Sequence, residues 1–349
     1  MVEQNFISLI GEQQDDSLEE LAYEVLVGLS STPKSLPSRF FYDDEGSELF
    51  RQIMRLEEYY LTDCEHEILT REATTIARSV DGPVHLVDLG AGDGSKTQTL
   101  LEAMLEDGAD VVYVPIDISV GAMRGVVEAM GKRFPELPIA GVVGEYSQSL
   151  RWLAEHRGER SNLVLFLGSN IGNFPMAAAR GFLGRLWAQL RIRDRLLIGF
   201  DLKKDIERLL AAYNDPQGVT AAFNLNLLKR VNRELGGNFD PEGFRHFGTY
   251  DVNTGAMKSY LVSKRKQSVY VGALQRSFEF AAWEPVHTEY SYKYLRDDIE
   301  GLAHDSGFEP VARYEDRQHW FMDALWRPRK GARLSEGPGR PGSDSPGAS

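Results

Sequence analysis

The chain has 349 residues, of which 42% are hydrophobic and 26% are charged, and its formal net charge is −13. These values are typical of a soluble globular protein with one large domain or two interleaved domains. The acidic balance disfavours a nucleic acid or an anionic membrane as a partner, because such partners require a basic surface. The single cysteine, Cys64, excludes an intramolecular disulfide and favours the reducing cytoplasm.

The first part of the chain predicts helices. Apolar residues recur at helical spacing in residues 17–30, in residues 47–56 and in residues 63–79, and a loop rich in serine and proline separates the first two segments. The amino terminus has no basic segment followed by an apolar core, so we expect no signal peptide. No apolar stretch in the sequence is long enough to span a bilayer.

The middle of the chain changes to a different pattern, in which short apolar runs alternate with helical segments. The runs occupy residues 85–90, 111–119, 139–146, 162–170 and 194–202. This alternation predicts βα units, and therefore an α/β fold with a parallel sheet covered by helices on both faces. Ligands of such sheets lie at the carboxyl ends of the strands.

After residue 203 the alternation stops, and two helical segments are followed by patterns of antiparallel strands. This part predicts a smaller α+β lobe, while a last strand pair within residues 311–326 returns to the sheet. The predicted division is an α/β domain, an inserted lobe and a disordered polar tail rich in glycine and proline. Their bounds are residues 64–202 plus 293–328, residues 10–63 plus 203–292, and residues 329–349.

A glycine-rich turn, DLGAGDGSK, follows the first predicted strand and opens a helix. Glycines allow the backbone to approach a ligand closely, and a helix start favours negative charge. The spacing Gly90-x-Gly92-x-Gly94 differs from the G-x-G-x-x-G pattern of dinucleotide enzymes, which requires glycine where Ser95 stands. A glycine needed only for packing is the simpler explanation of the turn taken alone.

Acidic residues at the next two strand ends favour a nucleoside ligand. Asp117, at the end of the second run, is placed to accept hydrogen bonds from both hydroxyl groups of a ribose. Glu145 and Tyr146, at the end of the third run, would lie beside an adenine. S-Adenosylmethionine carries ribose and adenine but no pyrophosphate, so these features together predict this cofactor.

The fourth run ends in FLGSNIGNF, residues 166–174. Gly168 and Gly172 have no side chains, so they leave room between cofactor and substrate at the edge where a parallel sheet binds its ligands. Asn173 then projects into the gap between cofactor and substrate as a neutral donor and acceptor, although an asparagine after a glycine is also compatible with a simple turn.

Several motifs together resemble the histidine N-alpha-methyltransferases of ergothioneine biosynthesis. They are FYDDEGSELFRQIMRLEEYYLT, LVDLGAGDGSKT, YVPIDIS, FLGSNIGNF and AYNDPQGVTAAFNLNLLKRVNRELGGNFD, and the similarity extends from about residue 35 to about residue 328. The resemblance implies a Rossmann-like S-adenosylmethionine domain with an inserted substrate lobe. It also implies three methylations of the histidine α-amine, which give the betaine hercynine.

The resemblance also implies roles for particular residues. Those that would hold the cofactor are Gly90, Lys96, Asp117, Glu145 and Tyr146.

The substrate residues follow from the same resemblance. Tyr59, Asn173 and Tyr213 would hold the carboxylate and amine of the amino acid, while the imidazole contacts and the methyl-transfer path would fall to Glu289, Ser291 and Tyr42. Taken singly, Tyr59 and Tyr213 are more simply explained as core tyrosines, and Glu289 as a residue of a surface strand.

Three positions depart from the pattern of the family. The family usually has a serine-rich turn where this chain has GDG, an aspartate where it has Glu145, and a methionine where it has Ser259. Because Ser259 would lie against the imidazole pocket, a methyltransferase for a different amino acid or small amine is the first alternative.

Two other classes of protein also fit parts of the pattern. They are an NAD-dependent dehydrogenase and a non-catalytic binding protein that retains the fold. The seven histidines show no metal-binding spacing, so we predict no metal. The expected partner is a small amino acid, bound by a cytoplasmic monomer.

Overall fold

The computed structural model describes residues 6–9, 14–156 and 158–331. The tail predicted to be disordered therefore lies outside the described residues from position 332 onward, as do residues 10–13 of the predicted lobe. Among the described helices, none has the length and the apolar composition needed to cross a membrane.

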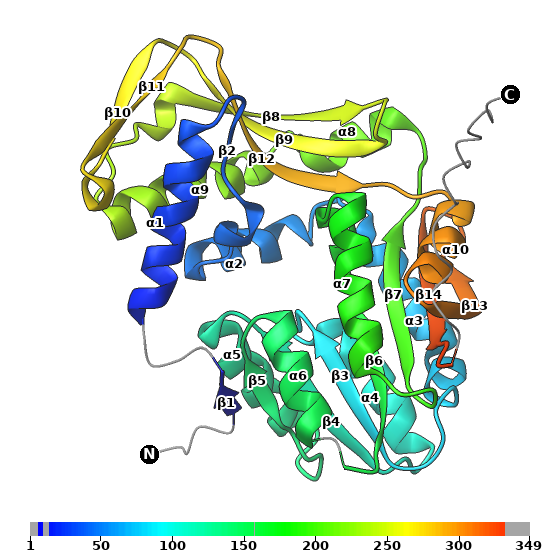
Figure 1. The fold of residues 1–349 in the computed structure, drawn as a ribbon. Helices are drawn as coiled ribbons and strands as arrows, with labels where there is room; N and C mark the ends of the chain where they lie inside the picture. Colours follow the sequence, from blue (N-terminus) through cyan, green and yellow to red (C-terminus); the bar gives the residue numbers. More distant parts are fainter. Residues whose placement is uncertain (1–5, 10–13, 157, 332–349) are drawn as a thin grey trace, which may run out of the picture.

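A large sheet forms the lower part of the molecule in Figure 1, with the strand order β1-β5-β4-β3-β6-β7-β14-β13. Strands β1 and β3 to β7 run parallel, whereas β14 and β13 are antiparallel to their neighbours. The bounds are β1 (Phe6–Ser8), β3 (Val84–Leu89), β4 (Val111–Asp117), β5 (Gly141–Val143), β6 (Ser161–Phe166), β7 (Arg195–Asp201), β13 (Phe308–Glu315) and β14 (Phe321–Pro328).

The five apolar runs of the sequence are strands β3 to β7, which confirms the predicted parallel sheet. One detail of the prediction is wrong. Strand β5 ends at Val143, because the chain turns there, so Glu145 and Tyr146 follow the strand, and Tyr146 opens helix α6. Strand β1 was not predicted; its three residues pair with β5 and form one edge of the sheet.

Helices cover both faces of this sheet (Figure 1). Strand β3 shows why: Val87 packs in the core that contains residues of α6, α7 and α10, whereas Leu86 packs in the core that contains residues of α3, α4 and α5. A strand buried on both faces is therefore mostly apolar, although β3 also carries His85 and the buried Asp88. These helices are α3 (Leu61–Ala77), α4 (Ser95–Glu106), α5 (Val120–Arg133), α6 (Tyr146–His156), α7 (Met176–Gln189) and α10 (Arg296–Asp305).

A smaller lobe lies above the large sheet in Figure 1 and is built from the amino-terminal helices and from residues 206–292. Its sheet has the order β2-β12-β9-β8, and β10 and β11 form a separate hairpin. Its elements are α1 (Gln14–Ser30), β2 (Lys34–Ser35), α2 (Asp44–Ile53), α8 (Ile206–Tyr213), α9 (Val219–Leu235), β8 (Phe244–Asp251), β9 (Ala256–Ser263), β10 (Gln267–Val271), β11 (Arg276–Phe280) and β12 (Pro285–Tyr292).

The small lobe has its own hydrophobic core, and a further cluster joins it to the large sheet. That cluster packs Cys64 and Ile68 of α3 against Leu209 of α8 and Phe321 of β14. Because this cluster crosses the predicted boundary, the division into residues 64–202 plus 293–328 and residues 10–63 plus 203–292 stays a proposal.

Candidate active site

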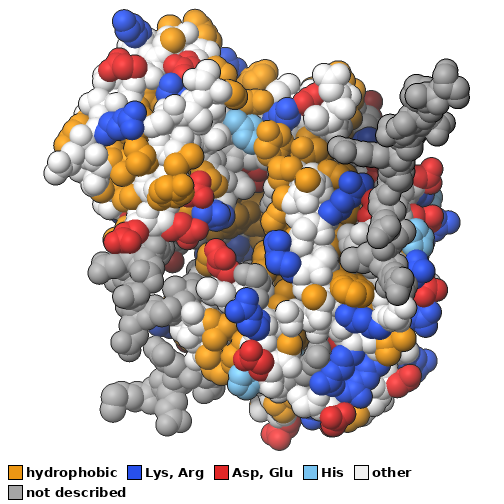
Figure 2. Space-filling view, viewed as in Figure 1, with side chains coloured by type: hydrophobic (Ala, Val, Ile, Leu, Met, Phe, Trp, Pro, Cys, Tyr) orange, Lys and Arg blue, Asp and Glu red, His pale blue; other side chains and the backbone are white. Residues whose placement is uncertain are grey.

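A cavity of about 800 Å³ lies between the carboxyl ends of the large sheet and the small lobe. The space-filling view shows the molecule hollowed between these two parts (Figure 2). Its lining comes from the loops after β3, β4, β5 and β6 on one side, and from α2 and β12 on the other. This is the edge at which a parallel sheet binds ligands.

The glycine-rich turn forms part of the floor of the cavity. Gly90, Gly92 and Gly94 all have positive φ, which is a conformation that residues with a side chain rarely adopt. A Cβ at Gly90 would lie 2.8 Å from Tyr146 Oη, and one at Gly94 would lie 2.5 Å from Met130 Cε. The turn therefore requires glycine both for its backbone and for the close approach of its neighbours.

Asp117 lies at the carboxyl end of β4 and lines the cavity. Its Oδ2 accepts a hydrogen bond from Gly92 N over 3.2 Å, and its Oδ1 accepts one from Ser119 N over 2.9 Å. Burial raises the pKa of Asp117, although these backbone N–H groups act in the opposite direction. The carboxylate is thus fixed between two loops at the position where the sequence predicted a ribose contact.

The remaining predicted cofactor residues also line the cavity. Lys96 Nζ lies 2.5 Å from Glu65 Oε2, so this lysine has a buried anionic partner. The ring of Tyr146 packs against Phe166, with ring centroids 5.5 Å apart, while Glu145 is exposed at the rim. The structure thus brings Gly90, Lys96, Asp117, Glu145 and Tyr146 to one side of one cavity.

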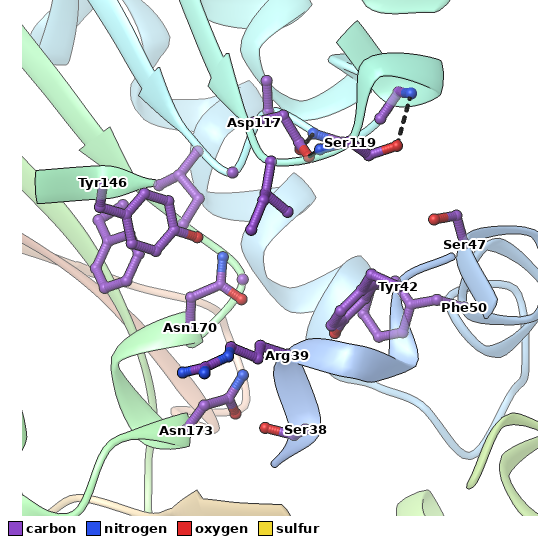
Figure 3. A pocket seen from close by; sticks show the side chains of 18 of the residues that line it. Ser38, Arg39, Tyr42, Ser47, Phe50, Asp117, Ser119, Tyr146, Asn170 and Asn173 are labelled. Atoms are coloured by element: carbon purple, nitrogen blue, oxygen red, sulfur yellow. Dashed lines mark hydrogen bonds between the residues drawn. The ribbon is translucent and has the colours of Figure 1, made fainter. Parts of the chain in front are cut away.

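The opposite wall is aromatic (Figure 3). Tyr42 packs edge-on against Phe50 and Phe223, with ring centroids 5.6 and 5.7 Å apart, and Phe50 packs edge-on against Tyr59. Burial raises the pKa of both Tyr42 and Tyr59, so both stay neutral phenols at physiological pH. Such a wall can hold a cation against aromatic faces without forming an ion pair.

Asn173 ends the short helix η2 (Asn170–Asn173), which follows β6. It lies on the side of the cavity opposite Tyr42 (Figure 3). A Cβ at Gly172 would lie 2.9 Å from the carbonyl oxygen of Tyr292, so the glycine allows η2 to press against β12. This close approach sets Asn173 beside the strand that carries the predicted imidazole residues.

Glu289 lines the cavity from β12, directly opposite Ser259 of β9 in the strand register. A β-bulge between His287 and Glu289 shifts this register. Burial raises the pKa of Glu289 to about 7, although Lys293 and a hydrogen bond from Ser259 act in the opposite direction. A carboxyl group in this state is suited to accept an N–H group of a ligand.

Three predicted substrate residues lie behind the wall of the cavity and not in its lining: Tyr213, Ser259 and Ser291. Tyr213 Oη and Ser291 Oγ are 2.7 Å apart, and the ammonium group of Lys293 donates to both oxygens over 2.9 and 2.8 Å. Their predicted contacts with a substrate therefore stay predictions.

Some lining residues were not predicted. Asn170 lies in the same FLGSNIGNF motif, beside Tyr146 and Asn173 in Figure 3, so the motif itself was the signal. Phe50 and Arg39 also line the cavity. Phe50 lies within the motif FYDDEGSELFRQIMRLEEYYLT, where it resembled an ordinary core residue, and Arg39 lies in the loop before that motif, where it resembled a surface residue. Among the described residues, no group of three or more histidine, cysteine or acidic side chains could hold a metal ion.

Comparisons with known proteins agree with this geometry. The family described as "Histidine-specific methyltransferase, SAM-dependent" matches residues 21–328. The chain is 40% identical to the histidine N-alpha-methyltransferase of Mycolicibacterium smegmatis, across 88% of this chain and 93% of that protein. It is 31% identical to ergothioneine biosynthesis protein 1 of Schizosaccharomyces pombe, across 84% of this chain and 40% of that protein.

A third relative acts on a different amine. The 4-dimethylallyltryptophan N-methyltransferase of Claviceps fusiformis is 29% identical, across 84% of this chain and 87% of that protein. The match of the family over nearly all of the described residues, and the identity to its histidine-specific relative, decide the assignment. The chain belongs to the family of histidine-specific, S-adenosylmethionine-dependent methyltransferases.

Proposed function

We propose that this enzyme methylates the α-amine of free L-histidine three times, to give hercynine for ergothioneine biosynthesis. One observation carries the proposal: Glu289 opens into the same cavity as the predicted cofactor residues and the aromatic wall. A carboxyl group at that place can accept an imidazole N–H, while the amine faces the cofactor side.

The cofactor, when bound, supplies a methyl group on a positively charged sulfur, which leaves with the bonding electrons as the amine attacks. The chain's own residues then have to position the amine, because an in-line displacement depends mainly on orientation. Asn173 and Tyr59 lie in the lining and offer neutral donors and acceptors. They can hold an amine without keeping it protonated.

Tyr42 orients the amine as a neutral phenol and does not serve as the base, because burial holds the pKa of Tyr42 well above its ordinary value. Each of the first two transfers gives a protonated, more substituted amine, which must release its proton to solvent before the next attack, and the third transfer gives a fixed positive charge. The rings of Tyr42 and Tyr59 tolerate this charge through cation–π attraction, which is worth about 0.5–2 kcal/mol. The same wall therefore suits the substrate and the product of every round.

Mass spectrometry of the reaction products tests the proposal. With L-histidine and S-adenosylmethionine we expect a mass increase of three methyl groups and the formation of hercynine. A panel of other amino acids, assayed in parallel, supplies the comparison. If another amino acid turns over much faster and histidine gives no methylated product, the substrate assignment fails while the methyltransferase assignment stands.

A second candidate is methylation of a different amino acid or small amine. Ser259, which faces Glu289 across β9 and β12, favours it, because a serine is smaller and more polar than the methionine expected there. The replacement Ser259→Met separates the candidates. If histidine is the substrate, this variant keeps its preference for histidine; if another amine is, the variant loses turnover of that amine.

The proposal also includes a cytoplasmic monomer that binds no nucleic acid or membrane. The buried free thiol of Cys64 and the acidic net charge support it. Light scattering coupled to size-exclusion chromatography tests the oligomeric state.

A further inference from the structure

Two fully buried carboxyl groups lie behind the cofactor side of the cavity. Glu65 comes from α3 and Asp323 from β14, and neither has any exposed surface. Burying a charged carboxylate is costly unless it is paired and hydrogen-bonded. Such a pair, outside the cavity lining, therefore calls for a physical reason.

Glu65 joins two loops of the cofactor side. Its Oε1 accepts a hydrogen bond from Gly168 N over 2.7 Å, and its Oε2 lies 2.5 Å from Lys96 Nζ. Gly168 belongs to the loop after β6, and Lys96 belongs to the first turn of α4, after the glycine-rich turn. Both residues line the cavity. The buried carboxylate of Glu65 therefore fixes the positions of two segments of the cavity wall.

The position of Glu65 depends on a glycine in the sheet. A Cβ at Gly199 of β7 would lie 2.4 Å from Glu65 Oε1. Any larger residue at that point of the strand would therefore displace the carboxylate. The sheet thus leaves a space that Glu65 fills together with the ring of Phe321, whose Cζ would lie 2.9 Å from that Cβ.

Asp323 has no ordinary donor. No N–H or hydroxyl group of the described residues donates to either of its carboxyl oxygens. Asp323 pairs with Gly199 across β14 and β7, and a Cβ at Gly199 would lie 2.4 Å from Glu65 Oε1, so the strand register places the Asp323 side chain next to Glu65. Two carboxyl groups packed side by side in a buried site do not both ionise. Burial, and then the charge of Glu65, raise the pKa of Asp323 well above its ordinary range, although Lys96 acts in the opposite direction.

We propose that Asp323 and Glu65 share a single proton, carried by Asp323, and that this pair positions Lys96 and Gly168 for the cofactor. Glu65 then accepts hydrogen bonds from the Gly168 N–H and the Asp323 O–H, and it forms an ion pair with the Lys96 ammonium group. The proton keeps the net charge of Glu65, Asp323 and Lys96 at zero. A second buried negative charge would repel the carboxylate of S-adenosylmethionine, which is the anionic group of that cofactor.

Isothermal titration of S-adenosylhomocysteine into the purified full chain tests the proposal, which rests on the proposed cofactor site but not on the identity of the substrate. Asp323→Asn should bind within about twofold of the wild type, because an uncharged donor is retained. Glu65→Gln should bind about tenfold more weakly, because its single acceptor oxygen cannot serve both Gly168 and Lys96. Asp305→Asn, at an exposed ion pair with Arg180, is the control and should bind normally.

An infrared spectrum supplies a readout that is independent of binding. At pH 8 the wild type should show the carbonyl stretch of a protonated carboxyl group, and Asp323→Asn should lose that band. The proposal is overturned if the two spectra agree, if Asp323→Asn changes affinity more than about fivefold, or if Glu65→Gln binds normally.

A second variant keeps the test decisive if Glu65→Gln is unstable. If Glu65→Gln does not fold, Lys96→Met replaces it: weaker binding supports the proposal, and unchanged binding overturns the role of Lys96. If the wild type itself fails to bind S-adenosylhomocysteine, the cofactor site is wrong, and the positioning role falls with it.

Discussion

Lys293 Nζ lies 2.7 Å from Asp201 Oδ2, and neither side chain has any exposed surface. Asp201 ends β7, whereas Lys293 directly follows β12, so this ion pair ties the large sheet to the strand that carries Glu289. Asp201 also pairs with Lys204. One buried carboxylate therefore serves two ammonium groups.

Because Asp201 pairs with two lysines, we expect its substitution to lower the free energy of unfolding more than the substitution of Lys293. Burial acts to raise the pKa of Asp201, but the charges of Lys293 and Lys204 hold that pKa below its ordinary value. Asp201→Asn leaves two ammonium groups without a carboxylate, so we expect a loss of about 3–5 kcal/mol in the free energy of unfolding. Lys293→Met leaves the pair with Lys204 intact, so we expect about 1–3 kcal/mol. Urea denaturation measures both.

The control is a half-buried pair near the surface of the lobe that contains β12. Asp251→Asn breaks the ion pair with Lys258, whose two charged atoms are 2.5 Å apart near the surface. We expect it to cost much less than Asp201→Asn, because solvent screens an ion pair near the surface. Equal losses for Asp201→Asn and Lys293→Met would show that the second lysine does not matter.

The sequence predicted most of the large sheet, because its strands are buried on both faces, are therefore mostly apolar, and are followed by glycine or acidic residues. It could not predict the buried charges. Lys293 and Glu65 resemble surface residues when read locally. Their partners are distant in the sequence: Glu65 and Gly168 are 103 residues apart. Only the packed fold shows that these charges are covered.

Within the site, the motifs predicted many of the residues near the cavity, but they did not show which of them line it and which lie behind the lining. Asn173 and Asp117 follow strands, so the topology alone placed them at the carboxyl edge. Tyr213 and Ser291 were predicted to touch the substrate, yet they lie behind the lining. The pairing of Glu289 with Ser259 depends on a β-bulge, which the sequence pattern does not reveal.

The titration of Glu289 predicts how stability depends on pH. Its pKa is raised from 4.5 to about 7 by burial. A raised pKa means that the folded state binds the proton more tightly than the unfolded state. The resulting stabilisation is fully present below pH 4.5 and is lost as the pH rises through 7. For the ligand-free protein we expect a loss of up to about 3 kcal/mol across this window.

Comparison with Glu289→Gln isolates this contribution, because the amide does not titrate. The difference in unfolding free energy between the two proteins should shrink or change sign between acidic and alkaline pH. The Michaelis constant for histidine should also fall in the wild type as the pH rises through 7, since the ionised carboxylate accepts the imidazole N–H. A difference in stability that is independent of pH would contradict the assigned titration.

Gly90 and Gly108 allow backbone strain to be separated from steric contact. Both have positive φ, at 78° and 74°. A Cβ at Gly90 would lie 2.8 Å from Tyr146 Oη, whereas a Cβ at Gly108 would meet nothing within 4 Å. Both alanine variants should lose about 1–2 kcal/mol through the backbone. Only Gly90→Ala should also displace Tyr146 and weaken the binding of S-adenosylhomocysteine, by about tenfold or more.

Thermal unfolding and titration calorimetry measure these two effects separately. If Gly108→Ala weakens cofactor binding as strongly as Gly90→Ala does, the loss comes from general destabilisation and not from the contact with Tyr146.

The hydroxyl group of Tyr42 provides the most direct test of the aromatic wall. Tyr42→Phe keeps the ring that packs against Phe50 and Phe223, so the fold and the cation–π surface should be retained. It removes one neutral hydrogen-bonding group from the cavity. If that group orients the amine, kcat should fall by about tenfold or more while the affinity for S-adenosylhomocysteine stays within about twofold.

Tyr270→Phe, at an exposed position in β10, is the matched control and should leave both quantities unchanged. An unchanged kcat in Tyr42→Phe would mean that the ring alone is needed, and that the amine is oriented from the side of Asn173.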